Sequence, residues 1–460
     1  MYLSGETVCS PACGVVRQEA TAPASMDLMT HAQDAPVVPA SAAAVRTNWA
    51  GNYAYTASQL LQPASVEEAT ALVRALPLVK GLGARHSFNH IADTSGTQID
   101  LGLLNSMQLD REGQTVWVGA GVRYGELAPW LDAQGFAVHN LASLPHISVA
   151  GACATGTHGS GLNNGCLSTA VVGLELIDGN GELSRITAAT HGDCFRAAVV
   201  GLGAMGVITA VQLKVIPAFD ITQTVYENLS FDELRANARA IFGAAYSVSL
   251  FTDWQGHRAT QAWMKQHVKS GERPEAQASF FGATRQTTKL HPLPGLSAEN
   301  CTEQMGVPGP WYARLPHFRL DYTPSAGAEL QTEYFVPFDR AVEAIAAVEE
   351  LRDDITPHLL TSELRTVAAD SLPMSMAYRR ESLAIHFTWK QEVAAVLALL
   401  PRIEAKLARF GARPHWAKLF TLPGAQLRTL YPELDGFVTQ ARTHDPAGKF
   451  RNAFLAELLG

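Results

Sequence analysis

Residues 79–89 read Val-Lys-Gly-Leu-Gly-Ala-Arg-His-Ser-Phe-Asn, and residues 143–161 read Ser-Leu-Pro-His-Ile-Ser-Val-Ala-Gly-Ala-Cys-Ala-Thr-Gly-Thr-His-Gly-Ser-Gly. The first stretch follows a helical pattern at residues 65–75 and predicts a tight loop, where glycine lets backbone N–H groups converge on a pyrophosphate. Small residues and hydroxyls dominate the second, as a loop around a large polyhydroxylated cofactor requires. Either stretch alone is compatible with a structural turn, but together they favour cofactor binding.

The sequence around these stretches mixes helix and strand. Short β-branched runs broken by glycine, such as residues 114–123, predict strands across residues 47–217. A helical pattern follows at residues 124–134 and ends at Gly135. Residues 171–186 predict a hairpin, because their central Asp-Gly-Asn-Gly run adopts positive φ at little cost.

Beyond residue 217 the pattern changes to longer amphipathic helices and aromatic-rich strands. The clearest helices are predicted at residues 340–351 and 392–410, and strands at residues 329–335 and 382–389. A second α+β domain built on an antiparallel sheet accounts for this pattern. The last stretch, residues 430–454, is turn-rich and too small to stand alone.

Length and composition limit the class of protein. A chain of 460 residues predicts two or three packed units. The net charge of -8 comes without a basic stripe, which excludes a typical nucleic-acid binder, and no apolar run approaches the ~20 residues of a membrane span. The six cysteines show no Cys-x-x-Cys spacing, and we expect free thiols in a reducing cytoplasm. They are Cys9, Cys13, Cys153, Cys166, Cys194 and Cys301.

Residues 1–45 are rich in Ala, Pro, Thr and Ser and have neither a basic start nor a continuous apolar core. We expect a disordered extension there, not a signal or transit peptide.

Several catalytic motifs are excluded by their context. Residues 201–206 match Gly-x-Gly-x-x-Gly, but helix-like residues 195–200 precede them and strand-like residues 207–215 follow. A dinucleotide fingerprint needs the reverse order, so we interpret these glycines as a helix-to-strand turn. The chain has no Gly-x-Ser-x-Gly or His-Glu-x-x-His sequence, and its histidine spacing predicts no metal site.

Residues 83–89 carry a family resemblance. They resemble the loop of the vanillyl-alcohol-oxidase-type flavoproteins, in which a histidine is joined covalently to the isoalloxazine methyl group of FAD; His86 matches that histidine. Many relatives have glycine or serine immediately before it, where this chain has Arg85. Other stretches resemble the alditol oxidases, and the resemblance runs from about residue 46 to the C-terminus. These are residues 47–52, 143–151, 154–159, 246–254 and 300–304.

The resemblance implies an α+β fold with a two-part FAD-binding domain of the vanillyl-alcohol-oxidase type and a substrate-binding cap. We place the binding domain at residues 46–218, the cap at residues 219–424, and a C-terminal segment returning to the binding domain at residues 425–460.

The resemblance also implies FAD attached through His86 alone. Residues 140–145, where some relatives have a second linking cysteine, contain none, and Cys153 is expected to be a small buried hydrophobe. The cofactor contacts that it implies lie mainly in the two glycine-rich stretches. They are Gly83, Ala84, Arg85, His86, Ser87, Ser143, Ser148, Gly151, Thr155, Gly156, Thr157, His158 and Val207.

Two pairs of polar residues alternate along predicted strands. Glu363 and Arg365 share one face, and so do His386 and Thr388. From the residues alone a surface ion-pair cluster is favoured. The resemblance implies instead a polyol site, with Lys418, His386 and Arg365 as the catalytic residues. The implied substrate-binding residues are Ser143, Glu363, Arg365, Thr388 and Lys418.

The implied reaction is oxidation of the terminal primary alcohol of an alditol, such as xylitol or sorbitol, to the aldose, with hydride moving to FAD and O2 reduced to H2O2. Either Lys418 or His386 is the base. The alternatives are an aldonolactone oxidase or dehydrogenase of the same family and a non-catalytic flavin or sugar binder. The expected partners are a small polyol and O2, with no nucleic acid and no membrane, and we expect a cytoplasmic monomer.

Overall fold

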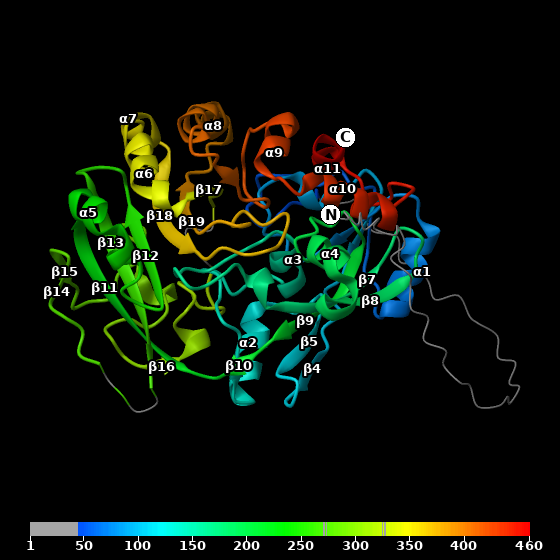
Figure 1. The fold of residues 1–460 in the computed structure, drawn as a ribbon, viewed down its shortest axis with the longest axis horizontal. Coiled ribbons are helices and arrows are strands. Elements are labelled where there is room, and N and C mark those ends of the chain that lie inside the picture. The colour runs from blue at the N-terminus through cyan, green and yellow to red at the C-terminus, as the bar shows by residue number, and fades with distance from the viewer. Residues whose placement is uncertain (1–44, 270–271, 273, 324, 326–327) are drawn as a thin grey trace, which may run out of the picture. The chain divides into compact units, whose positions relative to one another are not determined.

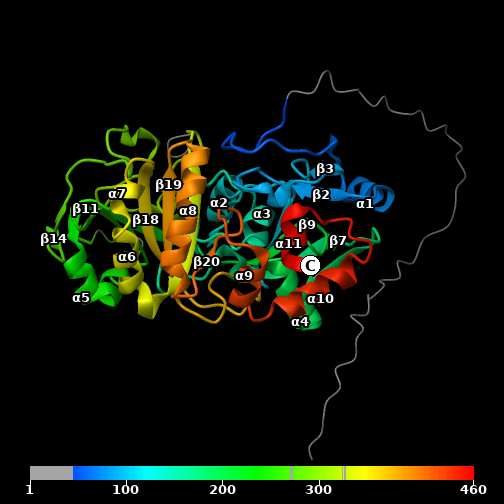
Figure 2. The ribbon, with the colours of Figure 1, turned by 90° about the horizontal axis from the view of Figure 1, so that it is seen from above.

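The computed structural model describes residues 45–269, 272, 274–323, 325 and 328–460. The extension predicted for residues 1–45 lies outside this range except for its last residue. Residues 47–460 form one compact unit by contact, so the boundaries predicted at residues 218 and 424 stay a prediction. Figures 1 and 2 show a ten-stranded sheet and its helices in one half of this unit and the N-terminal sheets in the other.

The first sheet carries the first glycine-rich stretch. Its strands pair in parallel in the order β1-β3-β2, and Ser65 begins the connecting helix α1 by accepting a hydrogen bond from the Glu68 N–H. The elements are β1 (Gln59–Leu61), α1 (Val66–Ala75), β2 (Val79–Leu82) and β3 (Thr97–Asp100). The loop predicted from residue 79 therefore begins only at Gly83, because buried Val79 and Leu82 belong to β2.

The second sheet is antiparallel, in the order β4-β5-β9-β7-β8, and its hairpin β7-β8 confirms the prediction at residues 171–186. Helix α4 ends before the turn at residues 201–206 and β9 begins after it, as predicted, with Gly203 at φ +64°. The elements are β4 (Met107–Asp110), β5 (Thr115–Gly119), α2 (Tyr124–Ala133), β7 (Val171–Ile177), β8 (Leu183–Thr187), α4 (Ala188–Val199) and β9 (Val207–Lys214). A separate short pair joins β6 (Phe136–Ala137) to β10 (Ile216–Pro217).

The second glycine-rich stretch is not a continuous loop. It contains helix α3 (Val149–Ala154), in which Val149, Ala150, Ala152 and Cys153 are buried. These small apolar residues pack into the core, which is why the chain forms a helical turn between the two loop parts.

The ten-stranded antiparallel sheet forms the predicted second α+β region. Its main path runs β14-β15-β11-β13-β12-β18-β19-β17-β20, with β16 beside β11. The strands are β11 (Asp220–Ser230), β12 (Ser247–Thr252), β13 (Arg258–Val268), β14 (Ser279–Phe280), β15 (Ala283–Arg285), β16 (Gly309–Pro310), β17 (Leu330–Pro337), β18 (Leu359–Val367), β19 (Ser382–Trp389) and β20 (Arg413–Pro414). The helices are α5 (Phe231–Phe242), α6 (Ala341–Glu349), α7 (Arg352–Ile355) and α8 (Val393–Ala408). The helices and strands predicted in this region are confirmed, with small shifts at their ends.

The two faces of this sheet have different partners. Apolar residues such as Leu250, Leu364 and Phe387 pack with helices α5, α6 and α8 in one core. The alternating residues of the same strands face the other way, where Val367 and Ala384 join the core of the N-terminal sheets. Polar residues on that second face therefore look toward the two glycine-rich stretches.

The C-terminal segment packs on the N-terminal elements. Its helices are α9 (Gly424–Leu430), α10 (Leu434–His444) and α11 (Ala453–Leu459). Helix α10 contacts α4 (Figure 2), and α11 contacts the turn at His90–Ala92. The Val79 N–H also bonds to the Lys449 carbonyl at 2.9 Å. The turn-rich interpretation of residues 430–454 was wrong for α10, since Leu434, Phe437, Val438 and Ala441 form one buried stripe.

No helix within the described part of the chain is both long and apolar enough to cross a membrane.

Candidate active site

A cavity lies where the glycine-rich stretches meet the polar face of the ten-stranded sheet. Of the predicted cofactor residues, those on its wall are Gly83, Ala84, Arg85, His86, Ser87, Ser143, Ser148, Gly151, Thr155, Thr157 and His158. The predicted catalytic and substrate residues lie on the same wall, namely Ser143, Glu363, Arg365, His386, Thr388 and Lys418. The surface ion-pair alternative is wrong, because the Glu363 and Arg365 side chains are each at most 7% exposed.

Two predicted cofactor residues are not on the cavity wall. Gly156 has φ +69° and lies against Met376, and Val207 is a buried core residue of β9.

His86 is held at the cavity by its neighbours. Its ring stacks on Trp49 with centroids 5.0 Å apart, and its buried Nδ1 has no hydrogen-bond partner among the described residues. Burial, with smaller effects from His146 and Lys418, lowers the pKa of His86 to about 3. The imidazole is therefore neutral at physiological pH and has a nitrogen lone pair available.

The residue before it, Arg85, has φ +62°. This left-handed backbone favours glycine, so an arginine at this position is strained.

The loop of His86 is tied to the loop of Lys418. The Asn89 amide donates to the carbonyls of Trp416 and Lys418 at 2.8 Å each, and the Phe88 N–H bonds to the Ala417 carbonyl at 2.7 Å. The Lys418 ammonium donates to Gln331 and lies 5.1 Å from the centre of the Phe88 ring. Hydrogen bonds therefore join the predicted cofactor loop directly to the loop of the predicted catalytic lysine.

Strand pairing places three titratable groups in one row. His386 on β19 pairs with Glu333 on β17 and with Glu363 on β18. Arg365, two residues along β18, donates to Glu333 and to the Ser143 hydroxyl at 3.0 Å each, and its Nε lies 3.5 Å from Glu363. Arg365 thereby joins the sheet to the second glycine-rich stretch.

The charge states follow from this arrangement. Burial favours the neutral form of Glu363, but Arg365 and His317 outweigh it and keep the pKa of Glu363 well below its usual value. Burial lowers the pKa of His386 to about 3 and that of Lys418 to about 8. At neutral pH Glu363 is ionised and His386 is neutral, and of these three residues Lys418 has the pKa closest to neutral pH.

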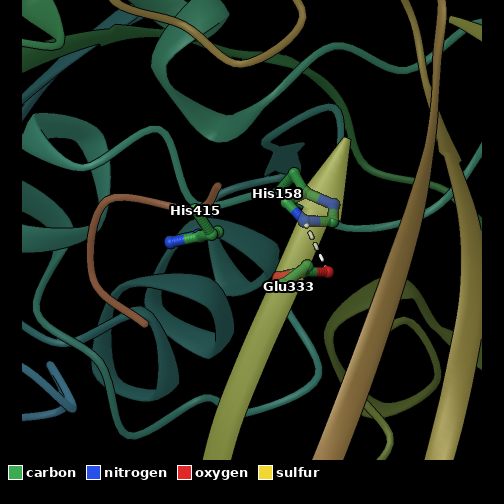
Figure 3. Close-up of side chains that lie close together, drawn as sticks. All are labelled: His158, Glu333 and His415. Atoms are coloured by element: carbon green, nitrogen blue, oxygen red, sulfur yellow. Dashed lines mark hydrogen bonds and ion pairs between the residues drawn. The ribbon is translucent and has the colours of Figure 1, made fainter. Parts of the chain in front are cut away.

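His158, Glu333 and His415 lie close enough together to hold a metal ion (Figure 3). The hydrogen bonds argue against that use. His158 Nδ1 faces the Gly159 carbonyl at 2.8 Å and Nε2 faces Glu333 at 3.1 Å, so both ring nitrogens already have a hydrogen-bond partner. Although burial alone raises it, His158, His386 and Arg365 hold the pKa of Glu333 well below its usual value. We interpret His158 and Glu333 as part of an ion network with Arg365, whereas His415 Nδ1 accepts a hydrogen bond from the Ala417 N–H at 3.1 Å.

Sequence reasoning missed several residues of the site. Glu333 and Gln331 alternate along a strand that was predicted correctly, so their shared polar face was a signal available in the sequence. His317, which donates to Glu363 at 2.8 Å, comes from a loop 46 residues away and gave no such signal.

The cavity suits FAD on the evidence of its own residues. A Cβ on Gly83 would lie 2.5 Å from the Ser148 hydroxyl oxygen, and one on Gly151 would lie 2.8 Å from the same atom. There is therefore no room for a Cβ beside Ser148 at either position, and the two glycines and Ser148 together line the cavity. Together with the unpartnered Nδ1 of His86, this cradle fits a flavin nucleotide.

Comparison with known proteins agrees with this site. The FAD binding domain family matches residues 57–187, and the D-arabinono-1,4-lactone oxidase family matches residues 328–458. The fold is similar to that of cholesterol oxidase from B. sterolicum, with a TM-score of 0.73 and 14% identity over 90% of this chain and 96% of the other. These matches define the class of protein as a flavoprotein with an FAD-binding domain and a fold similar to that of cholesterol oxidase.

Two relatives align over nearly their whole length. Alditol oxidase from Streptomyces sp. (strain IKD472 / FERM P-14339) is 46% identical over 417 residues, which are 90% of this chain and 98% of the relative. L-gulonolactone oxidase from Mus musculus is 27% identical over 442 residues, 89% of this chain and 97% of that protein. The chain therefore belongs to the vanillyl-alcohol-oxidase-type family of FAD-linked oxidases, in the group that includes alditol oxidase.

Proposed function

We propose that the protein oxidises the terminal primary alcohol of an alditol, such as xylitol or sorbitol, to the aldose while O2 is reduced to H2O2. The observation that carries this proposal is the row of donors and acceptors on the cavity wall, with Ser143, Glu363, Arg365, Thr388 and Lys418 facing one space. A linear polyol has hydroxyl groups along its whole length, and each must exchange water for a protein partner. The 46% identity to alditol oxidase supports the same substrate class.

Bound FAD supplies the acceptor for the two electrons of the alcohol and their route to O2. The protein's own task is to orient the reacting carbon and to take the hydroxyl proton. Lys418 suits the second role, because a base works best when its pKa is near the working pH, and burial brings the pKa of Lys418 to about 8. His386 is a weaker base, since burial lowers its pKa to about 3, and we assign it to substrate orientation together with Thr388.

Turnover and a flavin-bleaching assay test this function. Purified enzyme should oxidise xylitol or sorbitol with release of H2O2, and anaerobic polyol should bleach the flavin. Failure to bleach across a panel of polyols would favour a non-catalytic binder.

A second candidate is an aldonolactone oxidase or dehydrogenase, favoured by the match of residues 328–458 to the D-arabinono-1,4-lactone oxidase family. The same assay with L-gulono- and L-galactono-1,4-lactone separates the two. Turnover of lactones without polyols would overturn our proposal.

We further propose that FAD is attached covalently through His86 alone. The unpartnered Nδ1 and the stacking on Trp49 support a ring held ready for one bond. Cys153 is fully buried beside the Tyr124 hydroxyl, 3.7 Å away, and is not on the cavity wall. After acid precipitation the yellow colour should stay in the pellet, with the flavin mass on the peptide that contains His86. Flavin in the supernatant, or on the Cys153 peptide, would contradict this.

A monomeric state and a cytoplasmic location stay predictions from the sequence. Size-exclusion chromatography with light scattering tests the first, and cell fractionation tests the second.

A further inference from the structure

Lys265 is a fully buried cation behind the substrate site. It lies on β13, in the sheet that also carries Glu363 on β18 (Figure 1), and its side chain is 0% exposed. Its ammonium contacts the Leu315 carbonyl, the Pro316 carbonyl at 3.2 Å and His317 Nδ1 at 3.0 Å, with no ion pair to a carboxylate within the described ranges. A cation buried in this way costs stability that an apolar residue of similar size avoids. Packing therefore does not explain a lysine at this position.

The hydrogens of the Lys265 ammonium determine which ring nitrogen of His317 carries the proton. A lysine ammonium has three hydrogens, and Lys265 has three acceptors. His317 Nδ1 therefore accepts, which leaves the imidazole proton on Nε2. That nitrogen lies 2.8 Å from Glu363 Oε1 and donates to it. A chain of two hydrogen bonds thus connects the buried lysine to a carboxylate on the cavity wall.

Aromatic rings hold His317 in this orientation. Phe251 and Trp263 pack edge-on against the imidazole, with centroids 5.5 and 5.2 Å away. Because the ring is confined between them, its tautomer alone decides whether Glu363 receives a hydrogen bond.

We propose that Lys265 and His317 are positioning residues that hold Glu363 as a carboxylate able only to accept hydrogen bonds from the hydroxyl groups of an open-chain polyol. This inference rests on the proposed function and adds two residues that support its substrate contact. A hydroxyl group can donate to such a carboxylate, whereas the carbonyl and ring oxygen of a lactone's ester group can only accept. A substrate that presents a hydroxyl group at Glu363 is therefore favoured.

The arrangement depends on pH through Lys265. Burial lowers the pKa of Lys265 to about 7, Glu363 opposes that effect, Arg365 adds to it, and Cys301 is the other titratable group that acts on it. Burial and the charge of Lys265 lower the pKa of His317 to about 4, so His317 is neutral between pH 6 and 9. Deprotonated Lys265 has two hydrogens for three acceptors. His317 is then free to carry its proton on Nδ1 and to turn a lone pair toward Glu363, which weakens the substrate contact.

The test compares flavin-loaded full-length wild-type enzyme with Lys265→Met, using xylitol at pH 6 and pH 9. Glu363 stays ionised during the reaction, so its contact stabilises bound substrate and transition state alike and affects KM more than kcat. At pH 6 the variant should raise KM about tenfold, with kcat within about twofold of wild type. Wild-type KM should rise between pH 6 and 9 by a larger factor than the variant's KM, because Lys418, whose pKa is about 8, titrates in both proteins. A wild-type KM at pH 6 in Lys265→Met, or an unchanged pH dependence of KM, would overturn the inference.

Variants of His317 test the two hydrogen bonds from Lys265 to Glu363 independently. They keep the test possible if Lys265→Met does not fold. His317→Gln keeps an N–H donor for Glu363 and should keep a lower KM than His317→Leu, which has none. Equal KM values would overturn the inference. Met264→Ala is the matched control on β13, because Met264 packs on the opposite face, and it should lower thermal stability without changing KM.

If wild-type enzyme oxidises no polyol, the proposed function is wrong, and this inference is wrong with it. Normal polyol turnover with unaffected variants would remove the inference alone.

Discussion

Lys418 combines a lowered pKa with a fixed position. Its backbone is tied to Asn89, which lies three residues beyond His86, and its ammonium bonds to Gln331 on β17. Burial lowers the pKa of Lys418 to about 8, whereas the ordinary pKa of lysine lies far above neutral pH. A lysine held in this way can exchange a proton with substrate while the loop that holds the cofactor stays in place.

We predict that Lys418→Met keeps its bound flavin but loses about a hundredfold in kcat, corresponding to roughly 3 kcal/mol of barrier. Lys418→Arg should be equally impaired, because arginine keeps the charge but cannot act as a base. In wild type, the unprotonated lysine is the active form, so kcat should rise as pH increases through about 8 and level off above it. Stopped-flow flavin reduction and the flavin absorbance measure both effects. High activity in Lys418→Arg would show that the positive charge, and not the base, is what matters.

At the scale of elements, side chains that face the substrate cavity alternate along β18 with side chains that stabilise the core. Glu363 and Arg365 face the cavity, whereas Leu364 between them is fully buried against the helices. Because successive side chains of a strand point to opposite faces, a substitution at one position should leave the other face nearly unchanged.

We predict that Leu364→Ala costs about 2–5 kcal/mol of unfolding free energy, through the cavity it leaves, but keeps the KM and kcat of wild type. Glu363→Gln should do the opposite, raising KM for xylitol about tenfold with a small change in melting temperature. Thermal unfolding and steady-state kinetics on the two variants give the comparison. Kinetic damage in folded Leu364→Ala would show that the two faces are coupled.

The same alternation explains what the sequence predicted and what it did not. The facing pairs Glu363–Arg365 and His386–Thr388 depend only on positions two apart in one strand, and both pairs lie on the cavity wall as expected. Neighbours across strands depend on register, which no local pattern fixes. The contacts that link Lys265 on β13, through His317 in a loop, to Glu363 on β18 form only in the folded sheet.

Helix α10 was missed for another reason. The proline and glycine residues at its two ends predict turns, and residues 430–454 were therefore interpreted as turn-rich. The apolar residues between these ends nevertheless have helical spacing.

At the scale of the whole molecule, the end of the chain supports the loop that follows His86. The Asn452 amide donates to the carbonyls of His90, Ile91 and Asp93 at 2.8 to 3.1 Å, and Ile91 lies on the cavity wall. The Asn452 side-chain oxygen also accepts from the Leu455 N–H at 2.9 Å and begins helix α11. A residue near the C-terminus thus holds a cofactor-side turn more than 350 residues earlier in the sequence.

We predict that Asn452→Ala lowers the unfolding free energy by about 2 kcal/mol, since it removes both a helix cap and the donor to buried carbonyls. Because those carbonyls belong to the turn after His86, apoprotein should also incorporate added FAD more slowly. Enzyme that has taken up FAD should keep the wild-type KM, because Asn452 does not face the substrate.

Ser65→Ala is the matched control: it removes only the cap of α1, whose hydrogen bond to the Glu68 N–H is 3.2 Å long, and Ser65 is not on the cavity wall. It should cost about 1 kcal/mol and leave flavin incorporation unchanged. Calorimetry and the rise of protein-bound flavin absorbance measure the two quantities, and equal flavin incorporation in both variants would show that the C-terminal segment stabilises the fold without supporting the cofactor loop.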